Sequence, residues 1–296
     1  MANYTIRDLE SITGIKAHTI RIWEKRYGIV QPSRTDTNIR YYSDHELKRL
    51  LNVSILNAHG VKISKISRMD EQRISETLTE LVRHDGSHQT QIDSLMVAMV
   101  DLDRGRFEKI IADCSMRFGF EETCTSILFP FMSKVGLMWQ TDRVNPAQEH
   151  FISNLIKQKL YVAIDSLYSS TPRGPRCLVF LKEGEMHELG ILFARYLLKK
   201  QGFEAIYLGQ SVPYADLMET IAAFKPQVLM TAFVAAIQPE ELKEYIDRLC
   251  ADFPGPVLLF GAQMGRLTSA LPPNATYLTD AVALKTYAEG AVKAAA

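Results

Sequence analysis

Short apolar runs alternate with longer helical segments from residue 177 onward, and no other feature of the chain restricts its fold as strongly. The runs recur about every 20 to 30 residues, which is the spacing of βαβ units in a parallel sheet with helices on both faces. We therefore predict a doubly wound α/β domain over residues 175–296. Its expected strands are 177–181, 205–209, 228–233, 257–261 and 276–279, and its expected helices lie near 187–201, 214–224, 239–251 and 280–294.

The first of these runs leads into a loop that contains Glu185 and His187, with Gly190 shortly after them. Ligands of open α/β sheets bind at the carboxyl ends of the strands. His187 can offer one ring nitrogen to a metal while Glu185 accepts a hydrogen bond from the other nitrogen. Gly190 leaves room for a large flat ligand to approach the backbone. Taken alone, the same residues would also suit a solvated loop.

The N-terminal segment carries a surplus of positive charge, although the total charge of the chain is zero. Residues 1–68 contain 12 Lys and Arg against 6 Asp and Glu, whereas the whole chain contains 34 of each kind. A basic segment of this type indicates contact with nucleic acid. A solvated basic face would give the same counts.

Helical spacing and turn residues predict a winged helix-turn-helix over residues 1–75. Apolar residues within 5–27 predict two short helices that meet at Gly14. Pro32 and the polar turn at 36–38 then predict a β-hairpin, the wing. Ser43 is expected to N-cap the helix that follows. In this arrangement the second helix enters the major groove of DNA.

Residues 4–67 resemble the DNA-binding domain of the MerR family of transcription regulators. The resemblance rests on the start at Tyr4, the Arg-x-Trp-Glu-x-Arg-Tyr run that ends at Tyr27, and later residues: Pro32, Arg34, Asn38, Arg40, Tyr42, Gly60, Val61 and Ile66. It implies a homo-oligomer that binds a palindromic double-stranded promoter. By position it assigns DNA contacts to Thr19, Arg21, Arg26, Tyr27, Arg34, Arg40 and Tyr42. Core packing is the alternative role for Tyr27 and Tyr42.

A helical region follows the basic segment. The basic head is expected to end in a helix that runs to about Arg83, and polar residues with Gly86 predict a linker at 76–90. Helically spaced apolar residues predict a four-helix bundle at 91–172. In the bundle, Trp139 is followed ten positions later by Glu149 and His150. These three side chains could together cover a planar ligand. The alternative is a capped helix with the tryptophan in its core.

The order of these parts is similar to the cobalamin-binding modules of methionine synthase type, in which a helical bundle precedes a Rossmann-like sheet. With the MerR-like head, the arrangement resembles the CarH, CarA and LitR regulators. The resemblance implies that His187 is the lower axial ligand of cobalt and that Glu185 orients it. Trp139, Glu149 and His150 would then cover an upper adenosyl group. Further positions assigned to the cofactor by this resemblance are Gly190, Val212, Thr231 and Gly261.

The chain departs from the cobalamin-binding pattern along the expected path of the nucleotide tail. Where relatives have Ser-x-Leu, this chain has Thr231 and Phe233, and where they have two glycines it has Gly261 and Ala262. One added methyl in a filled site costs about 1–3 kcal/mol. Light-sensing relatives can also carry a histidine directly after the tryptophan, where this chain has Gln140.

These observations predict a cytoplasmic transcription regulator, not an enzyme, that binds adenosylcobalamin. The cofactor would control promoter binding and assembly into a dimer or tetramer, with the protein acting as a photoreceptor that responds to light. The four cysteines lack metal-ligand spacing and suit a reducing compartment, and no signal pattern or membrane-spanning run is present. Two alternatives are a regulator with a cofactor-free sensor domain and a cobalamin-dependent methyltransferase component.

Overall fold

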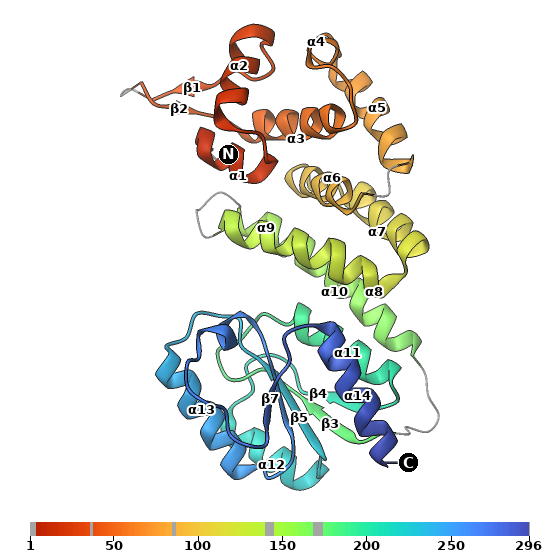
Figure 1. Ribbon diagram of the computed structural model, residues 1–296, viewed down its shortest axis with the longest axis vertical. Coiled ribbons are helices and arrows are strands. Elements are labelled where there is room, and N and C mark those ends of the chain that lie inside the picture. Colours follow the sequence, from red (N-terminus) through yellow and green to blue (C-terminus); the bar gives the residue numbers. More distant parts are fainter. Residues whose placement is uncertain (1–3, 36–37, 85–86, 140–144, 168–173, 296) are drawn as a thin grey trace. The chain divides into compact units, whose positions relative to one another are not determined.

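The computed structural model describes residues 4–35, 38–84, 87–139, 145–167 and 174–295 (Figure 1). The chain forms two compact units, Met1–Leu155 and Ile156–Ala296. The division falls inside helix α10 (Pro146–Ser166), upstream of the boundary near residue 175 that the sequence predicts. Among the described residues, none of the helices is both long and apolar enough to cross a membrane.

The first unit begins with the predicted winged helix-turn-helix. Thr5 and Asp8 cap α1 (Ile6–Thr13) reciprocally, and Gly14 ends it in the left-handed conformation with φ 73°. Two short antiparallel strands form the wing, although residues 36–37 of its predicted turn lie outside the described residues. The remaining elements of this region are α2 (Ala17–Tyr27), β1 (Ser33–Arg34), β2 (Arg40–Tyr41), α3 (Asp44–Ala58), α4 (Ile63–Ile66) and α5 (Glu71–His84).

The helical bundle belongs to the same compact unit as the head. Every residue of α6 (His88–Val100) from Thr90 to Met99 is buried, because α6 packs against α3 of the head as well as α7 and α9 of the bundle. The helix expected to run to about Arg83 ends at His84 as α5, and the next helix begins at His88, so helices occupy most of the predicted linker at 76–90. The other bundle elements are α7 (Arg104–Phe118), α8 (Phe120–Glu122), the π-helical η1 (Thr123–Leu128), α9 (Phe129–Trp139) and α10.

The second unit contains a five-stranded parallel sheet in the order β4-β3-β5-β6-β7. The chain moves outward from β3 to β4 and then returns to the other side of β3 with β5. The reversal creates a switch point between β3 and β5, where ligands of such sheets bind. The elements are β3 (Arg176–Val179), α11 (Leu189–Lys200), β4 (Glu204–Tyr207), α12 (Tyr214–Phe224), β5 (Val228–Ala232), α13 (Pro239–Asp252), β6 (Val257–Phe260), the 3₁₀ turn η2 (Ala262–Arg266), β7 (Ala275–Tyr277) and α14 (Ala281–Ala295).

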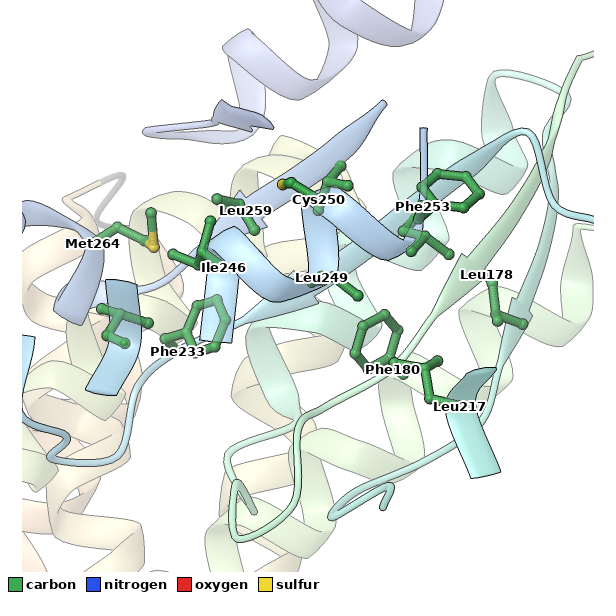
Figure 2. Close-up of a cluster of buried hydrophobic side chains, with 13 residues drawn as sticks. Leu178, Phe180, Leu217, Phe233, Ile246, Leu249, Cys250, Phe253, Leu259 and Met264 are labelled. Carbon is green, nitrogen blue, oxygen red and sulfur yellow. The ribbon is translucent and has the colours of Figure 1, made fainter. Parts of the chain in front are cut away.

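Helices cover both faces of the sheet, as the sequence predicts for a doubly wound domain. Helices α11 and α14 pack together on one face, and α12 and α13 cover the other (Figure 1). Between the sheet and α13 lies an apolar core that includes Phe180, Phe233, Ile246 and Leu249, all shown in Figure 2. Burial of this core fixes the register of β5, because residues on alternate positions of a strand face opposite sides.

Candidate functional site

The loop that carries Glu185 and His187 leaves β3 at the switch point and is tied to the neighbouring loop after β4. The Val212 amide donates to the Leu181 carbonyl at 2.9 Å, and the Ser211 amide donates to the Glu185 carbonyl at 3.2 Å. The Gly184 amide also donates to the Ser211 hydroxyl at 3.1 Å. These backbone contacts hold the loop in one conformation before any ligand arrives.

Glu185 is the buried centre of this loop, with only 3% of its surface exposed. One carboxylate oxygen accepts hydrogen bonds from the Val234 and Ala235 amides at 2.7 and 2.8 Å. The other accepts the His187 amide at 2.9 Å and lies 2.7 Å from its Nδ1. Burial by itself would raise the pKa of Glu185, but these hydrogen bonds outweigh it and lower the pKa to about 2. The carboxylate is therefore ionised at neutral pH.

His187 stands in the opposite environment, because 60% of its side chain is exposed. The hydrogen bond to Glu185 assigns the proton to Nδ1, so Nε2 carries the lone pair that can bind a metal. Two exposed apolar residues lie on the loops joined by Glu185: Met186, next to His187 in the chain, and Val234, whose amide donates to Glu185. A single imidazole beside apolar surface suits a metal that arrives inside a flat macrocycle, which brings the remaining ligands with it.

Two glycines assigned to the site from the sequence differ in what the fold requires of them. A Cβ at Gly261 would lie 2.1 Å from the Phe233 carbonyl oxygen, and φ is 103°, so the backbone itself demands glycine there. A Cβ at Gly190, in the first turn of α11, would meet no atom within 4 Å. Gly190 is exposed, so packing within the chain does not require a glycine there.

The departures near the expected tail path lie on the α13 face of the sheet. Phe233 is fully buried in the core under α13, whereas Gly190 belongs to α11 on the opposite face. Thr231 faces the same side as Phe233, and its buried hydroxyl has no hydrogen-bond partner among the described residues. Ala262 is exposed at the start of η2. Phe233 therefore leaves the space beside Gly190 unobstructed.

The predicted upper-face residues belong to the first unit. Glu149 and His150 lie near the start of α10, and their side chains form a 3.0 Å ion pair between Oε2 and Nδ1. The His150 side chain is 73% exposed. Trp139 is the last residue of α9, but its side chain lies outside the described structure, as does the whole of Gln140.

The predicted DNA-binding face contains exposed arginines, one of which is hydrogen-bonded to a neighbouring side chain. Arg21 and Arg26 are exposed on α2, where Thr19 and Tyr27 are half-buried. Arg34, in the wing, donates to the Asn38 side chain at 2.6 Å. Exposed guanidinium groups on a helix and a neighbouring hairpin form a surface that can meet phosphates.

A half-buried carboxylate, which the sequence analysis did not single out, organises the wing. Glu24 of α2 accepts hydrogen bonds from Arg40 Nε at 3.4 Å and from the Tyr42 hydroxyl at 3.3 Å. Tyr42 is completely buried, so in this structure it supports the wing from the core and does not meet DNA directly. The sequence signal for Glu24 is a lone carboxylate within a cationic recognition helix.

Family models match the head and the helical bundle of the chain. Residues 4–73 match the family model described as MerR HTH family regulatory protein, and residues 91–164 match the model described as B12 binding domain. The chain is 30% identical over 263 residues to the HTH-type transcriptional repressor CarA of Myxococcus xanthus, covering 87% of each protein. It is 27% identical to the repressor CarH of the same organism, covering 88% of this chain and 89% of CarH.

A solved structure supports the fold of the C-terminal part. The monomethylamine corrinoid protein of Methanosarcina barkeri superimposes with a TM-score of 0.53 and 17% sequence identity. The match covers 69% of this chain and 99% of that protein. At this identity the likeness describes the arrangement of helical bundle and parallel sheet alone.

Proposed function

The chain belongs to the family of MerR-type regulators that carry a B12-binding domain, and from that premise we propose that it controls transcription in response to adenosylcobalamin bound at His187. The head would bind double-stranded promoter DNA, and the cofactor would set the assembly of a homo-oligomer, a dimer or tetramer. Light is the proposed signal, and the cytoplasm the proposed compartment. In this function the chain is a regulator and not an enzyme.

The pairing of Glu185 with His187 carries the proposal. His187 would hold the cobalt of the cofactor through Nε2, and Glu185 would keep the imidazole proton on Nδ1. Gly190 would admit the macrocycle close to α11. The bound cofactor would supply a cobalt–carbon bond that light can break. Trp139, Glu149 and His150 are the proposed contacts of the adenosyl group.

The remaining assigned positions support the cofactor less directly. Val212 fixes the loop through its amide, and Gly261 shapes the backbone beside Phe233. The unpartnered buried hydroxyl of Thr231 offers a hydrogen bond to a bound polar group. In the head, Arg21, Arg26 and Arg34 are the proposed phosphate or base contacts.

The direct test is the absorption spectrum of the protein purified in darkness with adenosylcobalamin. We expect a retained corrin spectrum, and we expect His187→Ala to lose the bound cofactor or its axial nitrogen signature. His45→Ala, which changes a histidine of the head, serves as the control and should keep the wild-type spectrum. A wild-type protein without a corrin spectrum, or a His187→Ala protein with an unchanged one, would contradict the proposal.

The closed apolar core around Phe233 favours a second candidate function, a MerR-type regulator with a cofactor-free sensor domain. Such a domain would respond to a protein partner or to another small ligand. Promoter binding and oligomeric state that stay the same with and without adenosylcobalamin, in darkness and in light, would favour this candidate over the first.

A further inference from the structure

Glu188 is a buried carboxylate directly beside His187, and the proposed function assigns it no role. It is 7% exposed and occupies the N-cap position of α11, yet its side chain does not cap that helix. One oxygen instead lies 2.6 Å from Lys157 Nζ on α10. The other accepts a hydrogen bond from the Tyr207 hydroxyl of β4 at 2.9 Å. Glu188 thus joins three elements of the second unit.

Burying a charge costs free energy unless the charge is paired and hydrogen-bonded. Glu188 therefore needs both Lys157 and Tyr207. Lys157 keeps 29% of its side chain exposed, which lets it balance the carboxylate while part of it stays hydrated. Losing Lys157 would leave Glu188 buried without its countercharge.

The charge of Glu188 affects the pKa of two tyrosines. Burial and then the nearby Glu188 carboxylate raise the pKa of Tyr161, which lies one helical turn after Lys157 on α10. The same two causes, in the same order, raise the pKa of Tyr207. Arg195 of α11 donates to the Ala205 carbonyl at 3.1 Å and opposes both shifts. The direct contacts that join α10, α11 and β4 are those of Glu188 with Lys157 and with Tyr207.

The loop between β3 and α11 has little freedom to move without disturbing this cluster. Glu185 is fixed to the backbone after β5, and Glu188 is fixed to α10 and β4. His187 lies between them. A metal that bound the imidazole would therefore act on a loop whose far side is fixed to Lys157 through Glu188.

We propose that Glu188 and Lys157 link ligand binding at His187 to α10, so that the second half of this helix changes its stability when the imidazole binds a metal. The link rests on the proposed function, because it needs a ligand at His187. Glu188 and Lys157 are positioning residues, which act through the loop and not by contact with the bound group.

Hydrogen–deuterium exchange of residues 157–166 in the full chain, with and without hydroxocobalamin, tests the link. Binding should slow exchange in this segment of the wild-type protein by about threefold or more, since exchange reports local opening. Glu188→Gln keeps an acceptor for Tyr207 but loses the charge, and Lys157→Met keeps the alkyl stem. Both variants should retain the corrin spectrum while α10 stops responding.

A charge exchange, Lys157→Glu together with Glu188→Lys, should restore part of the response, whereas a merely structural role would not predict rescue. Gln158→Ala, on the exposed side of α10, is the control and should respond as the wild type does. A bound corrin with an unchanged α10 response in both single variants overturns the link alone. Absence of the corrin spectrum from the wild-type protein overturns the proposed function and the link with it.

Discussion

Two carboxylates, Glu24 in the head and Glu185 in the sheet domain, organise their surroundings to different degrees. Glu24 is 18% exposed and accepts hydrogen bonds of 3.3 and 3.4 Å from two side chains. Glu185 is 3% exposed and makes four contacts between 2.7 and 2.9 Å, three of them with backbone amides. The first arrangement holds a wing loosely, while the second holds one imidazole in a single tautomer.

The difference follows from what each region would bind. A polyanion is met by many exposed cations, each of which contributes part of the affinity and keeps its hydration until contact. A metal at one imidazole depends on one nitrogen, which must be oriented in advance. Single changes should therefore have graded effects in the head and abrupt effects in the His187 loop.

The largest expected effect comes from Glu185→Leu. This change leaves the Val234 and Ala235 amides without their acceptor, and a buried unsatisfied group costs about 1–3 kcal/mol. A loss of about 3 kcal/mol in local stability corresponds to roughly 100-fold faster amide exchange at these two positions. Native-state hydrogen exchange measures it, and Glu183→Leu on the exposed turn nearby is the matched control. If amide exchange at Val234 and Ala235 does not change, Glu185 does not stabilise its loop more strongly than Glu24 stabilises the wing.

The sequence was sufficient to predict the contact between Glu185 and His187, because two positions in one loop bring the side chains together whatever the rest of the fold does. The elements were also predictable, since apolar periodicity follows directly from burial. The acceptor role of Glu185 toward Val234 and Ala235 was not, because it depends on how β5 lies beside β3. The pairing of Glu188 with Lys157 could not be predicted either, because it also depends on how separate elements pack together.

The sequence also could not predict which side chains of an element are buried. Tyr42 fits a DNA-contact position in the sequence, yet the pairing of Tyr4 with Tyr42 draws its ring into the core. The burial of Phe233 likewise depends on which face of the sheet its position points to, and a shift of one residue reverses that face. Sequence spacing locates such residues on an element, but only the packed structure decides which face they occupy.

The second prediction compares two helical glycines, Gly190 and Gly290, neither of which has an atom within 4 Å of a Cβ position. Without ligand, substitution by alanine should leave each protein as stable as the wild type or up to about 1 kcal/mol more stable. With adenosylcobalamin, Gly190→Ala should weaken binding about 5- to 150-fold, since a methyl in a filled site costs about 1–3 kcal/mol. Gly290→Ala on α14 should leave the affinity unchanged. Equal affinities in a titration followed by absorbance would mean that the space at Gly190 is not used.

The third prediction concerns the graded behaviour of the head. Arg21→Ala should reduce the slope of log affinity against log salt by about 0.9, because one phosphate contact is lost. At low salt the affinity itself should fall only several-fold. Fluorescence anisotropy with a random-sequence DNA duplex gives both quantities, and Arg266→Ala in the sheet domain is the control. A slope that does not change would show that Arg21 contacts no phosphate.

The smallest expected effect comes from Tyr42→Phe, which removes the hydroxyl that donates a hydrogen bond to Glu24. The loss should lower the free energy of unfolding by about 1 kcal/mol at neutral pH. Burial and then Glu24 raise the pKa of Tyr42 to about 12, so the folded state favours the neutral phenol. This contribution is fully present below pH 10, the ordinary pKa, and is lost as pH rises through about 12.

The stability difference between wild type and Tyr42→Phe should therefore shrink between pH 10 and 12. Urea unfolding in a Trp139→Phe background follows it, because Trp23 is then the single tryptophan and is buried in the head. Tyr41→Phe, the neighbouring change on β2, should keep the alkaline loss of stability seen in the wild type. If the difference for Tyr42→Phe instead stays constant with pH, the hydroxyl is not held by Glu24, and the wing depends on Arg40 alone. The two carboxylates would then differ in kind, since only Glu185 would fix a neutral, hydrogen-bonded partner.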